Sequence, residues 1–336
     1  MRHRAVRSWG AVIGTVLALA AVGTACGNGG DGGGDGETTA VTIVTEWSFP
    51  DPLWIPFLAA DDQGFYAEAG LDVTIQAPPD NSTTMKMLAS GDAQVGLSAI
   101  TDVVFARAEE LPVVSVANMT VRNNWGLFSL EDRPIDISAL RGKTIGIYDD
   151  SWTAAMLPLM LDSGGLTIDD VETVSATGSV IPLLLEGEID VATEVTNLGG
   201  VEIVTSGGGD PQVLLAPEVG APDTPVWVYV ADSRWAQENP DRVTAWLDAT
   251  RQGAEWAIEN PEDAVALFEE AYPEVASAHE YNLAAWQATA PLLSEDGEWF
   301  TQTETQWIGF TKALVDAGQL DEALDATEYY TNDYLP

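Results

Sequence analysis

Short runs of β-branched and apolar residues alternate with longer segments of helical period along most of the chain. Alternation of strand and helix predicts βαβ units on a mostly parallel sheet. The polar segment 122–124 interrupts the alternation, which then starts again, so the pattern predicts two such sheets. The expected strands are 41–44, 73–75, 94–97 and 113–116 in the first set and 144–147, 171–174, 190–192 and 213–215 in the second; the expected helices are 54–69, 83–89, 101–110, 154–161 and 180–186.

The last third of the chain has a helical pattern. After the strand-like run 226–230, Asn239-Pro240 and Asn260-Pro261 each place an N-cap residue before a Pro at the first helical position, which predicts two helix starts. Further helices are expected over 276–293, 303–317 and 320–327.

Together these patterns predict an α/β fold with two lobes, each a mostly parallel sheet flanked by helices, and a helical C-terminal region. We expect lobe 1 over residues 41–122 and 226–336, which include the helical tail, and lobe 2 over residues 123–225. Ligands of open α/β sheets bind outside the carboxyl ends of the strands. The cleft between the lobes is therefore the expected site for one small molecule.

The N-terminus has the pattern of a secretory signal. Three Arg within the first seven residues precede the uncharged stretch 8–25, which ends in small residues before Cys26. A transmembrane anchor is the alternative, but the apolar run is short for the ~20 residues that span a membrane. We expect a lipoprotein signal peptide over 1–25, because Cys26, the single Cys of the chain, stands where a bacterial lipoprotein carries its lipidated cysteine.

A Gly-rich polar run follows Cys26, and such a run forms a flexible tether. We therefore expect residues 26–40 to hold a lipid anchor and a linker. The folded body would then lie at the extracytoplasmic face of a bacterial cell membrane.

Composition narrows the possible functions. The 336 residues include 53 Asp and Glu against 13 Lys and Arg, a net charge of −40, which excludes a nucleic-acid partner. One Cys and two His leave little for a thiolate cluster, a zinc site or a His-based triad, so we expect no metal, no cofactor and no catalytic residue. An apolar fraction of 46% and 12 Trp indicate a folded core despite the acidity. Removal of residues 1–25 leaves a net charge of −43, which suits a salt-rich exterior.

Four stretches carry a resemblance to a known family. In each, a helix ends at a Gly that enters the left-handed turn cheaply, and a polar step leads into a strand. The stretches are 56–73, 88–96, 140–146 and 183–191. They are similar to solute-binding lipoproteins of ABC importers, in the branch for nitrate, sulfonate, taurine and pyrimidine precursors. The resemblance implies a type II periplasmic-binding-protein-like fold, a monomer that closes on a small molecule and delivers it to a membrane permease.

Shorter motifs resemble one branch, the proteins that bind thiamine pyrimidine precursors. They are Trp47 with 50–51, 78–80, 101–107, 111–114, 199–202 and 219–222. The implied ligand is a hydroxymethyl- or formylaminopyrimidine. Binders of riboflavin, sulfonate, nitrate or taurine remain alternatives of the same fold, although the few Lys and Arg in the expected cleft loops argue against an anion. An adhesive or structural surface lipoprotein is an alternative of another class.

The resemblance also raises an enzymatic alternative, because fungal relatives make the pyrimidine rather than carry it. Their chemistry depends on His and a Cys-rich motif. In this chain, His279 is the one His beyond the signal and Cys26 is committed to the anchor. We therefore expect that the chain is not an enzyme.

Candidate ligand-binding residues in lobe 1 follow the predicted strands. Trp47 ends the first strand and is suited to stack on a heteroaromatic ring. The following loop adds Asp51, whose alternative role is a helix cap, and Trp54. Further candidates between strands and helices, each with a capping or packing role as the alternative, are Asn81, Ser98, Thr101 and Asp102.

The loop 148–153 is the richest candidate in lobe 2. Trp152 is expected to face Trp47 across the cleft as an aromatic sandwich, or else to pack on the helix that it starts. A buried carboxylate that accepts two hydrogen bonds from an aminopyrimidine would give selectivity, and both Glu194 and Glu202 remain open for this role. The other candidates are Tyr148, Ser151, Thr153, Asn197 and, on the crossover, Thr224; Trp227 borders the cleft or belongs to the core.

Overall fold

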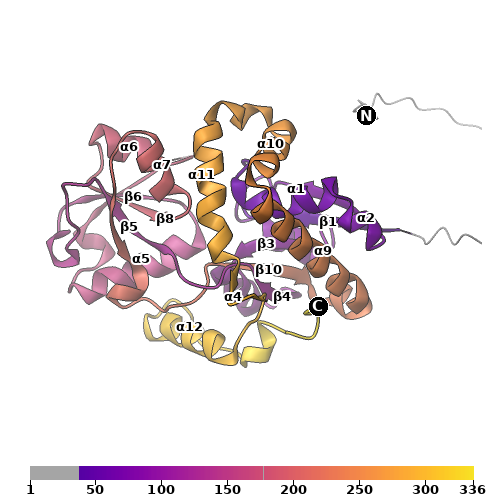
Figure 1. Cartoon of the computed structure of the whole chain (residues 1–336). Helices are drawn as coiled ribbons and strands as arrows, with labels where there is room; N and C mark the ends of the chain where they lie inside the picture. Colours follow the sequence, from indigo (N-terminus) through magenta and orange to yellow (C-terminus); the bar gives the residue numbers. More distant parts are fainter. Residues whose placement is uncertain (1–37, 177) are drawn as a thin grey trace, which may run out of the picture. The chain divides into compact units, whose positions relative to one another are not determined.

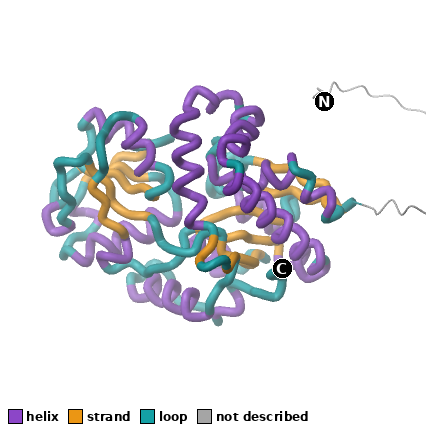
Figure 2. Tube along the Cα trace, viewed as in Figure 1, coloured by secondary structure: helices purple, strands orange, loops and turns teal. Residues whose placement is uncertain are grey.

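Two separate five-stranded sheets organise the part of the chain that the computed structural model describes, residues 38–176 and 178–336 (Figures 1 and 2). The predicted signal peptide, Cys26 and all but the last residues of the tether lie outside the described residues. The first sheet has the order β2-β1-β3-β10-β4 and the second β7-β6-β8-β5-β9. The strands are β1 (Thr39–Val44), β2 (Leu71–Gln76), β3 (Val95–Ala99), β4 (Val113–Asn118), β5 (Trp125–Ser129), β6 (Thr144–Ile147), β7 (Glu172–Ser175), β8 (Val191–Val195), β9 (Gln212–Leu215) and β10 (Trp227–Asp232).

Both sheets are mixed, but in each sheet four strands run in one direction and one is reversed, which confirms the predicted mostly parallel sheets. β1 pairs in parallel with β2 and β3, and β6 with β7 and β8. The strands β10 and β5 run antiparallel to both of their neighbours. These two strands directly follow the connections that lead from one sheet to the other, so each sheet receives one reversed strand. We call the first sheet with its helices lobe 1 and the second lobe 2; the boundaries drawn at 122 and 226 stay a prediction.

The helices follow the local signals of the sequence. The Asn-Pro signals are confirmed, since α9 begins at Pro240 and α10 at Pro261. One predicted helix is divided, because Gly64 has a φ of +83° and separates α1 from α2. The helices are α1 (Ile55–Asp62), α2 (Phe65–Glu68), α3 (Thr84–Ser90), α4 (Ile100–Ala108), α5 (Ser151–Ser163), α6 (Ile181–Glu186), α7 (Gly199–Thr205), α8 (Ser233–Glu238), α9 (Pro240–Glu259), α10 (Pro261–Ala271), α11 (His279–Thr289) and α12 (Glu304–Asp316).

The helix expected over 320–327 is wrong. Only a single 3-10 turn, Ala326–Glu328, forms there. Leu324 is largely exposed, and its N–H donates to the hydroxyl of Tyr329 rather than to a helical carbonyl. The periodicity of Leu320 and Leu324 therefore does not mark a buried helix face. A short hairpin, β11 (Ser294–Glu295) with β12 (Glu298–Trp299), was not predicted either.

Two large hydrophobic clusters join the helices to one another and to the sheets. In one, α1 packs on α9 and α10, with Trp54, Trp246 and Trp286 fully buried. In the other, α4 of lobe 1 packs on α5 of lobe 2, and Phe310 of α12 joins them. The helix α11 contacts α10 on one side and α7 of lobe 2 on the other (Figure 1). Within the described residues, no helix combines the length and the apolar character needed to cross a membrane.

Candidate ligand-binding site

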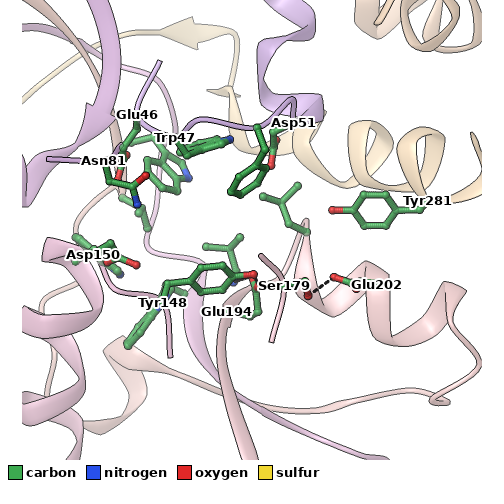
Figure 3. Close-up of a pocket in the computed structure, with 18 residues that line it drawn as sticks. Glu46, Trp47, Asp51, Asn81, Tyr148, Asp150, Ser179, Glu194, Glu202 and Tyr281 are labelled. Atoms are coloured by element: carbon green, nitrogen blue, oxygen red, sulfur yellow. Dashed lines mark hydrogen bonds between the residues drawn. The ribbon is translucent and has the colours of Figure 1, made fainter. Parts of the chain in front are cut away.

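A cavity of about 160 Å³ lies where residues that follow β1, β6 and β8 come together (Figure 3). Its volume is below the ~300 Å³ at which pockets for drug-sized molecules begin, so it fits a single-ring solute. Two wider hollows, of about 520 and 550 Å³, have fewer aromatic side chains. The cavity is lined by Glu46, Trp47, Phe49, Asp51, Asn81, Trp125, Tyr148, Asp150, Trp152, Ser179, Glu194, Val195, Leu198, Gly199, Glu202, Val226, Trp227 and Tyr281.

Five carboxylates line the cavity. Among the described residues that form its wall there is no Lys, Arg or His. The local potential is therefore strongly negative, which favours a cationic or N–H-bearing solute and opposes an anion. The five are Glu46, Asp51, Asp150, Glu194 and Glu202.

Glu194 is held as a hydrogen-bond acceptor by its own lobe. It lies in β8, one residue before the last, and its Oε1 accepts from the hydroxyl of Tyr148 at 2.6 Å, while Oε2 accepts from the N–H of Val195 at 2.9 Å. Burial raises the pKa of Glu194 to about 7, against the opposing effect of the Tyr148 hydrogen bond. The carboxyl group is thus pre-oriented by its own lobe.

The remaining acids differ in their partners. Asp51 caps the 3-10 helix Pro52–Trp54 through the N–H of Leu53 at 2.8 Å, and burial raises its pKa to about 7. Asp150 caps α5 through the N–H of Thr153 at 2.6 Å, and burial raises its pKa to about 6. Glu202 accepts from the hydroxyl of Ser179 at 2.6 Å. The Oε2 atom of Glu46 is buried and has no hydrogen-bond partner among the described residues.

The aromatic wall is arranged differently from the predicted sandwich. Trp152 stacks on Phe310, with ring centroids 5.9 Å apart and an angle of 11°, because α12 packs against α5. Trp47 instead packs on Trp227 at 5.0 Å and 60°. The indole N–H groups of Trp47, Trp152 and Trp227 are buried without an acceptor among the described residues. The wall therefore offers a ligand both ring surfaces and hydrogen-bond donors.

Four predicted site residues lie instead in a polar contact between the lobes. Asp102 accepts from Ser98 at 2.7 Å and from Ser151 at 2.6 Å, and the hydroxyls of Thr101 and Ser151 lie 2.6 Å apart. They do not line the cavity, because their hydrogen-bonding groups face one another across the junction of α4 and α5. In this protein, these four polar residues connect the two lobes instead of lining the cavity.

Four others also lie outside the cavity wall. Trp54 is fully buried and packs edge-on against Tyr272 at 5.4 Å, which makes it a core residue. Thr153 completes the Asp150 cap, and Asn197 donates to Thr289 of α11 at 2.8 Å. Thr224 lines the hollow beside α12. The predicted residues that line the cavity are Trp47, Asp51, Asn81, Tyr148, Trp152, Glu194 and Glu202.

Several residues of the wall were not predicted as site residues. Glu46 stands next to Trp47 just after β1, and Asp150 lies in the loop 148–153. Both follow strands, so the rule that ligands bind at the carboxyl ends of strands also applies to them. Trp125 belongs to the unpredicted strand β5, and Tyr281 reaches the cavity from α11, a helix of the C-terminal region in which no site residue was predicted. No local signal in the sequence marks Tyr281. The others are Phe49, Ser179, Val195, Leu198, Gly199 and Val226.

The two α/β lobes with a small cavity at their strand ends define a solute-binding-protein fold. In agreement, the periplasmic aliphatic sulphonate binding protein SsuA from Escherichia coli superposes with a TM-score of 0.68, over 86% of this chain and 91% of that chain, at 14% identity. The chain belongs to the NMT1/THI5-like family, whose model matches residues 51–264.

Two curated relatives differ in what their names state. A formylaminopyrimidine-binding protein from Halalkalibacterium halodurans is 27% identical over 236 residues, which cover 69% of this chain and 70% of the relative. A 4-amino-5-hydroxymethyl-2-methylpyrimidine phosphate synthase from Aspergillus parasiticus is 24% identical over 310 residues, which cover 89% of this chain and 88% of the relative. The family thus contains both a binding protein and enzymes.

The expectation that the chain is not an enzyme is therefore overturned. It rested on the scarcity of His and Cys, yet several named relatives are phosphate synthases, including proteins of Saccharomyces cerevisiae. Composition alone does not separate the enzymes of this family from its binding proteins.

Proposed function

We propose that the chain is an extracytoplasmic solute-binding protein of an ABC importer. Its solute would be a single-ring aminoheterocycle of the thiamine pyrimidine precursor type, such as a hydroxymethyl- or formylaminopyrimidine. The observation that carries the proposal is the cavity, whose described wall combines aromatic rings with five carboxylates and holds no basic residue. The name of the Halalkalibacterium halodurans relative supports the same class of solute.

The cavity offers complementary groups for an aminopyrimidine. Indole and phenol rings supply flat apolar surfaces, and aromatic stacking adds ~0.5–1.5 kcal/mol beyond the burial of area. Glu194 supplies a pre-oriented acceptor for N–H groups, while Trp47 Nε1 supplies a donor for a ring nitrogen. An analogue without the amino group would leave a buried acceptor unpaired, which is the basis of strong selectivity.

Ligand binding to the purified protein tests the solute class. We expect 4-amino-5-hydroxymethyl-2-methylpyrimidine to quench Trp fluorescence in a saturable way, since Trp47, Trp125, Trp152 and Trp227 line the cavity, and to raise the melting temperature. Taurine, nitrate and riboflavin serve as competitors of the same fold class. Binding of one of these instead of any pyrimidine would reject the solute and keep the fold.

Delivery to a permease and the lipid anchor are further parts of the proposal. Transport is tested in a cell that lacks pyrimidine synthesis: growth on added pyrimidine should require this gene together with those of a permease and an ATPase. Anchoring is tested with Cys26→Ser, which should release the protein from the membrane fraction. Size-exclusion chromatography tests the proposed monomer.

Synthesis of the pyrimidine phosphate is a second candidate, favoured by the names of the fungal relatives. The same auxotroph distinguishes the two functions. Growth without added pyrimidine would demonstrate synthesis, whereas growth that depends on added pyrimidine would demonstrate uptake.

A further inference from the structure

Glu46 is a buried carboxylate that the protein leaves incompletely satisfied. It lies two residues after the end of β1, it is only 3% exposed, and it lines the cavity (Figure 3). Its Oε2 atom has no hydrogen-bond partner among the described residues. A buried charge without a partner is costly, so such a group calls for a ligand that satisfies it.

The surroundings of Glu46 add negative charge rather than neutralise it. Asp102 on α4 and Asp150 at the start of α5 face it from the two lobes. Burial and these two carboxylates raise the pKa of Glu46 well above its usual range, against the opposing effect of the Ala99 N–H. The other titratable groups of the cavity wall are Asp51, Glu194, Glu202, Tyr148 and Tyr281.

The neighbouring acids have side-chain or backbone donors of their own, whereas the Oε2 atom of Glu46 has none among the described residues. Asp102 accepts from Ser98 and Ser151, and Asp150 accepts from Thr153. Among the described residues, no group of three or more acids, His or Cys has the geometry to hold a metal ion. A cationic N–H group on an organic solute would satisfy Glu46, and the adjoining indole of Trp47 favours the same charge through its ring face.

A protonated aminopyrimidine has the required shape. Its ring N–H and its exocyclic amino group point in the same direction, as two N–H groups of Arg do towards a carboxylate. We propose that Glu46 forms a cation subsite in which the bound solute presents this protonated edge to its carboxylate, with one proton shared by the pair. The inference rests on the proposed function, because it assumes a solute of the aminopyrimidine class.

The proton has a defined source. Where Glu46 is protonated in the free protein, the neutral ring receives the proton from its carboxyl group and no uptake occurs. Above the pKa values of both free partners, the complex takes one proton from solvent. Affinity then falls about tenfold for each pH unit. A phosphate ester of the same ring would place an anion among the five carboxylates of the wall, and this like-charge repulsion lowers affinity by about 100-fold or more.

Isothermal titration calorimetry tests the subsite. The probes are 4-amino-5-hydroxymethyl-2-methylpyrimidine and its phosphate, measured from pH 6 to 10 in buffers of different ionisation enthalpy. The purified wild type should bind the unphosphorylated probe with uptake of one proton at the alkaline end. Glu46→Gln should bind it about tenfold or more weakly and without that uptake. Glu202→Gln, on a carboxylate that already has a donor in Ser179, is the matched control and should keep the uptake.

The outcomes separate the inference from the proposed function. If wild type binds but Glu46→Gln keeps both the proton uptake and the pH slope, the subsite is wrong and the solute class stands. Equal affinity for the phosphate also overturns the subsite. If wild type binds no aminopyrimidine, the proposed function fails and the subsite with it. Glu46→Asp, which retains a carboxylate, should restore proton uptake, and circular dichroism confirms that each variant is folded.

Discussion

The two lobes contribute chemically different halves of the same cavity. In lobe 2, Glu194 and Glu202 receive hydrogen bonds from side chains of their own lobe, and Asp150 receives one from the backbone of α5. In lobe 1, Asp51 is satisfied as a cap, whereas Glu46 is buried with an unpartnered oxygen. The lobe 2 acceptors are thus positioned before a ligand arrives, while lobe 1 holds the group that a ligand would have to satisfy.

Because of this difference, variants in the two lobes should affect ligand affinity and the stability of the unligated protein differently. Changes to the lobe 2 acceptors should weaken ligand binding and destabilise the unligated protein together, because the same hydrogen bonds serve both. A change at Glu46 should weaken binding while the unligated protein is unaffected or stabilised, since an unpaired buried charge opposes folding. Variants in each lobe test this contrast between pre-positioned acceptors in lobe 2 and an incompletely satisfied carboxylate in lobe 1.

Gly199→Ala should have the largest effect. A Cβ atom at Gly199 would lie 2.1 Å from Cγ of Glu194, which is buried and held by Tyr148. Glu194 must therefore move, and overpacking of this kind costs about 1–3 kcal/mol. We expect about 5- to 150-fold weaker binding by calorimetry, the affinity equivalent of that energy, and a lower melting temperature.

Gly200→Ala is the matched control, because it lies in the same helix and gains the same helix propensity. Its Cβ would meet Cε1 of Phe128 at 3.1 Å, a contact that a small shift relieves. Equal losses of affinity in the two variants would show that Glu194 is not the group that matters.

Tyr148→Phe should have the next largest effect and addresses stability directly. It removes the hydroxyl that donates to Glu194 and leaves that buried carboxyl group short of a partner, at a cost of about 1–3 kcal/mol. Urea unfolding of the unligated protein measures the loss. Tyr281→Phe is the control, since no hydrogen bond of the Tyr281 hydroxyl is found among the described residues. Unchanged stability in Tyr148→Phe would remove the basis for calling lobe 2 pre-arranged.

The course of the chain was largely predictable, because its signals are local. The left-handed Gly residues and the Asn-Pro starts act within a few residues, and the helices begin and end near them. The strand β5 and its antiparallel pairing were not predictable in this way. Trp125 pairs with Val195, 70 positions along the chain, and such pairing depends on tertiary contacts rather than on local pattern.

The cavity was predictable only where strand ends define it. Trp47, Tyr148 and Glu194 lie at or just after the carboxyl ends of strands, where ligands of open α/β sheets bind. The same rule selected Asp102 and Ser151, which the protein uses to join its lobes. A polar residue at a strand end is equally suited to bind a ligand or another loop, and only the three-dimensional arrangement distinguishes the two.

The stability of the unligated protein should fall as pH rises from about 5 to 7.5. Burial raises the folded-state pKa of Asp51 and Glu194 to about 7 and that of Asp150 to about 6, above the values of an unfolded chain. The folded state therefore binds more protons within this window, and stability is lost as pH rises through the folded pKa values. Repulsion among surface acids acts in the same direction, so only the difference between wild type and a variant is informative.

Variants of single carboxylates show how much each lobe contributes to the dependence of stability on pH. Glu46→Gln and Glu194→Gln should each remove the contribution of one group, at most about 1.4 kcal/mol per pH unit. Glu46→Gln should in addition be the more stable of the two at pH 8, because it removes a buried carboxylate that has one oxygen without a partner among the described residues, whereas both oxygens of Glu194 accept hydrogen bonds. Urea unfolding at several pH values provides the measurement, and a Glu46→Gln slope identical to that of wild type would contradict the buried titration of Glu46.

Ser151→Ala should have the smallest effect and tests whether the lobes themselves are coupled to binding. Ser151 of lobe 2 donates to Asp102 of lobe 1, and its hydroxyl lies 2.6 Å from that of Thr101. Loss of these contacts costs about 0.5–1.5 kcal/mol, which corresponds to less than about tenfold in affinity if the contacts form only when the lobes are together. Ser90→Ala, which removes a comparable bond to the exposed Asp92, should leave affinity unchanged. If Ser151→Ala lowers stability without lowering affinity, the contact of Ser151 with Asp102 and Thr101 is present with and without ligand. The two halves of the cavity would then form one preformed wall.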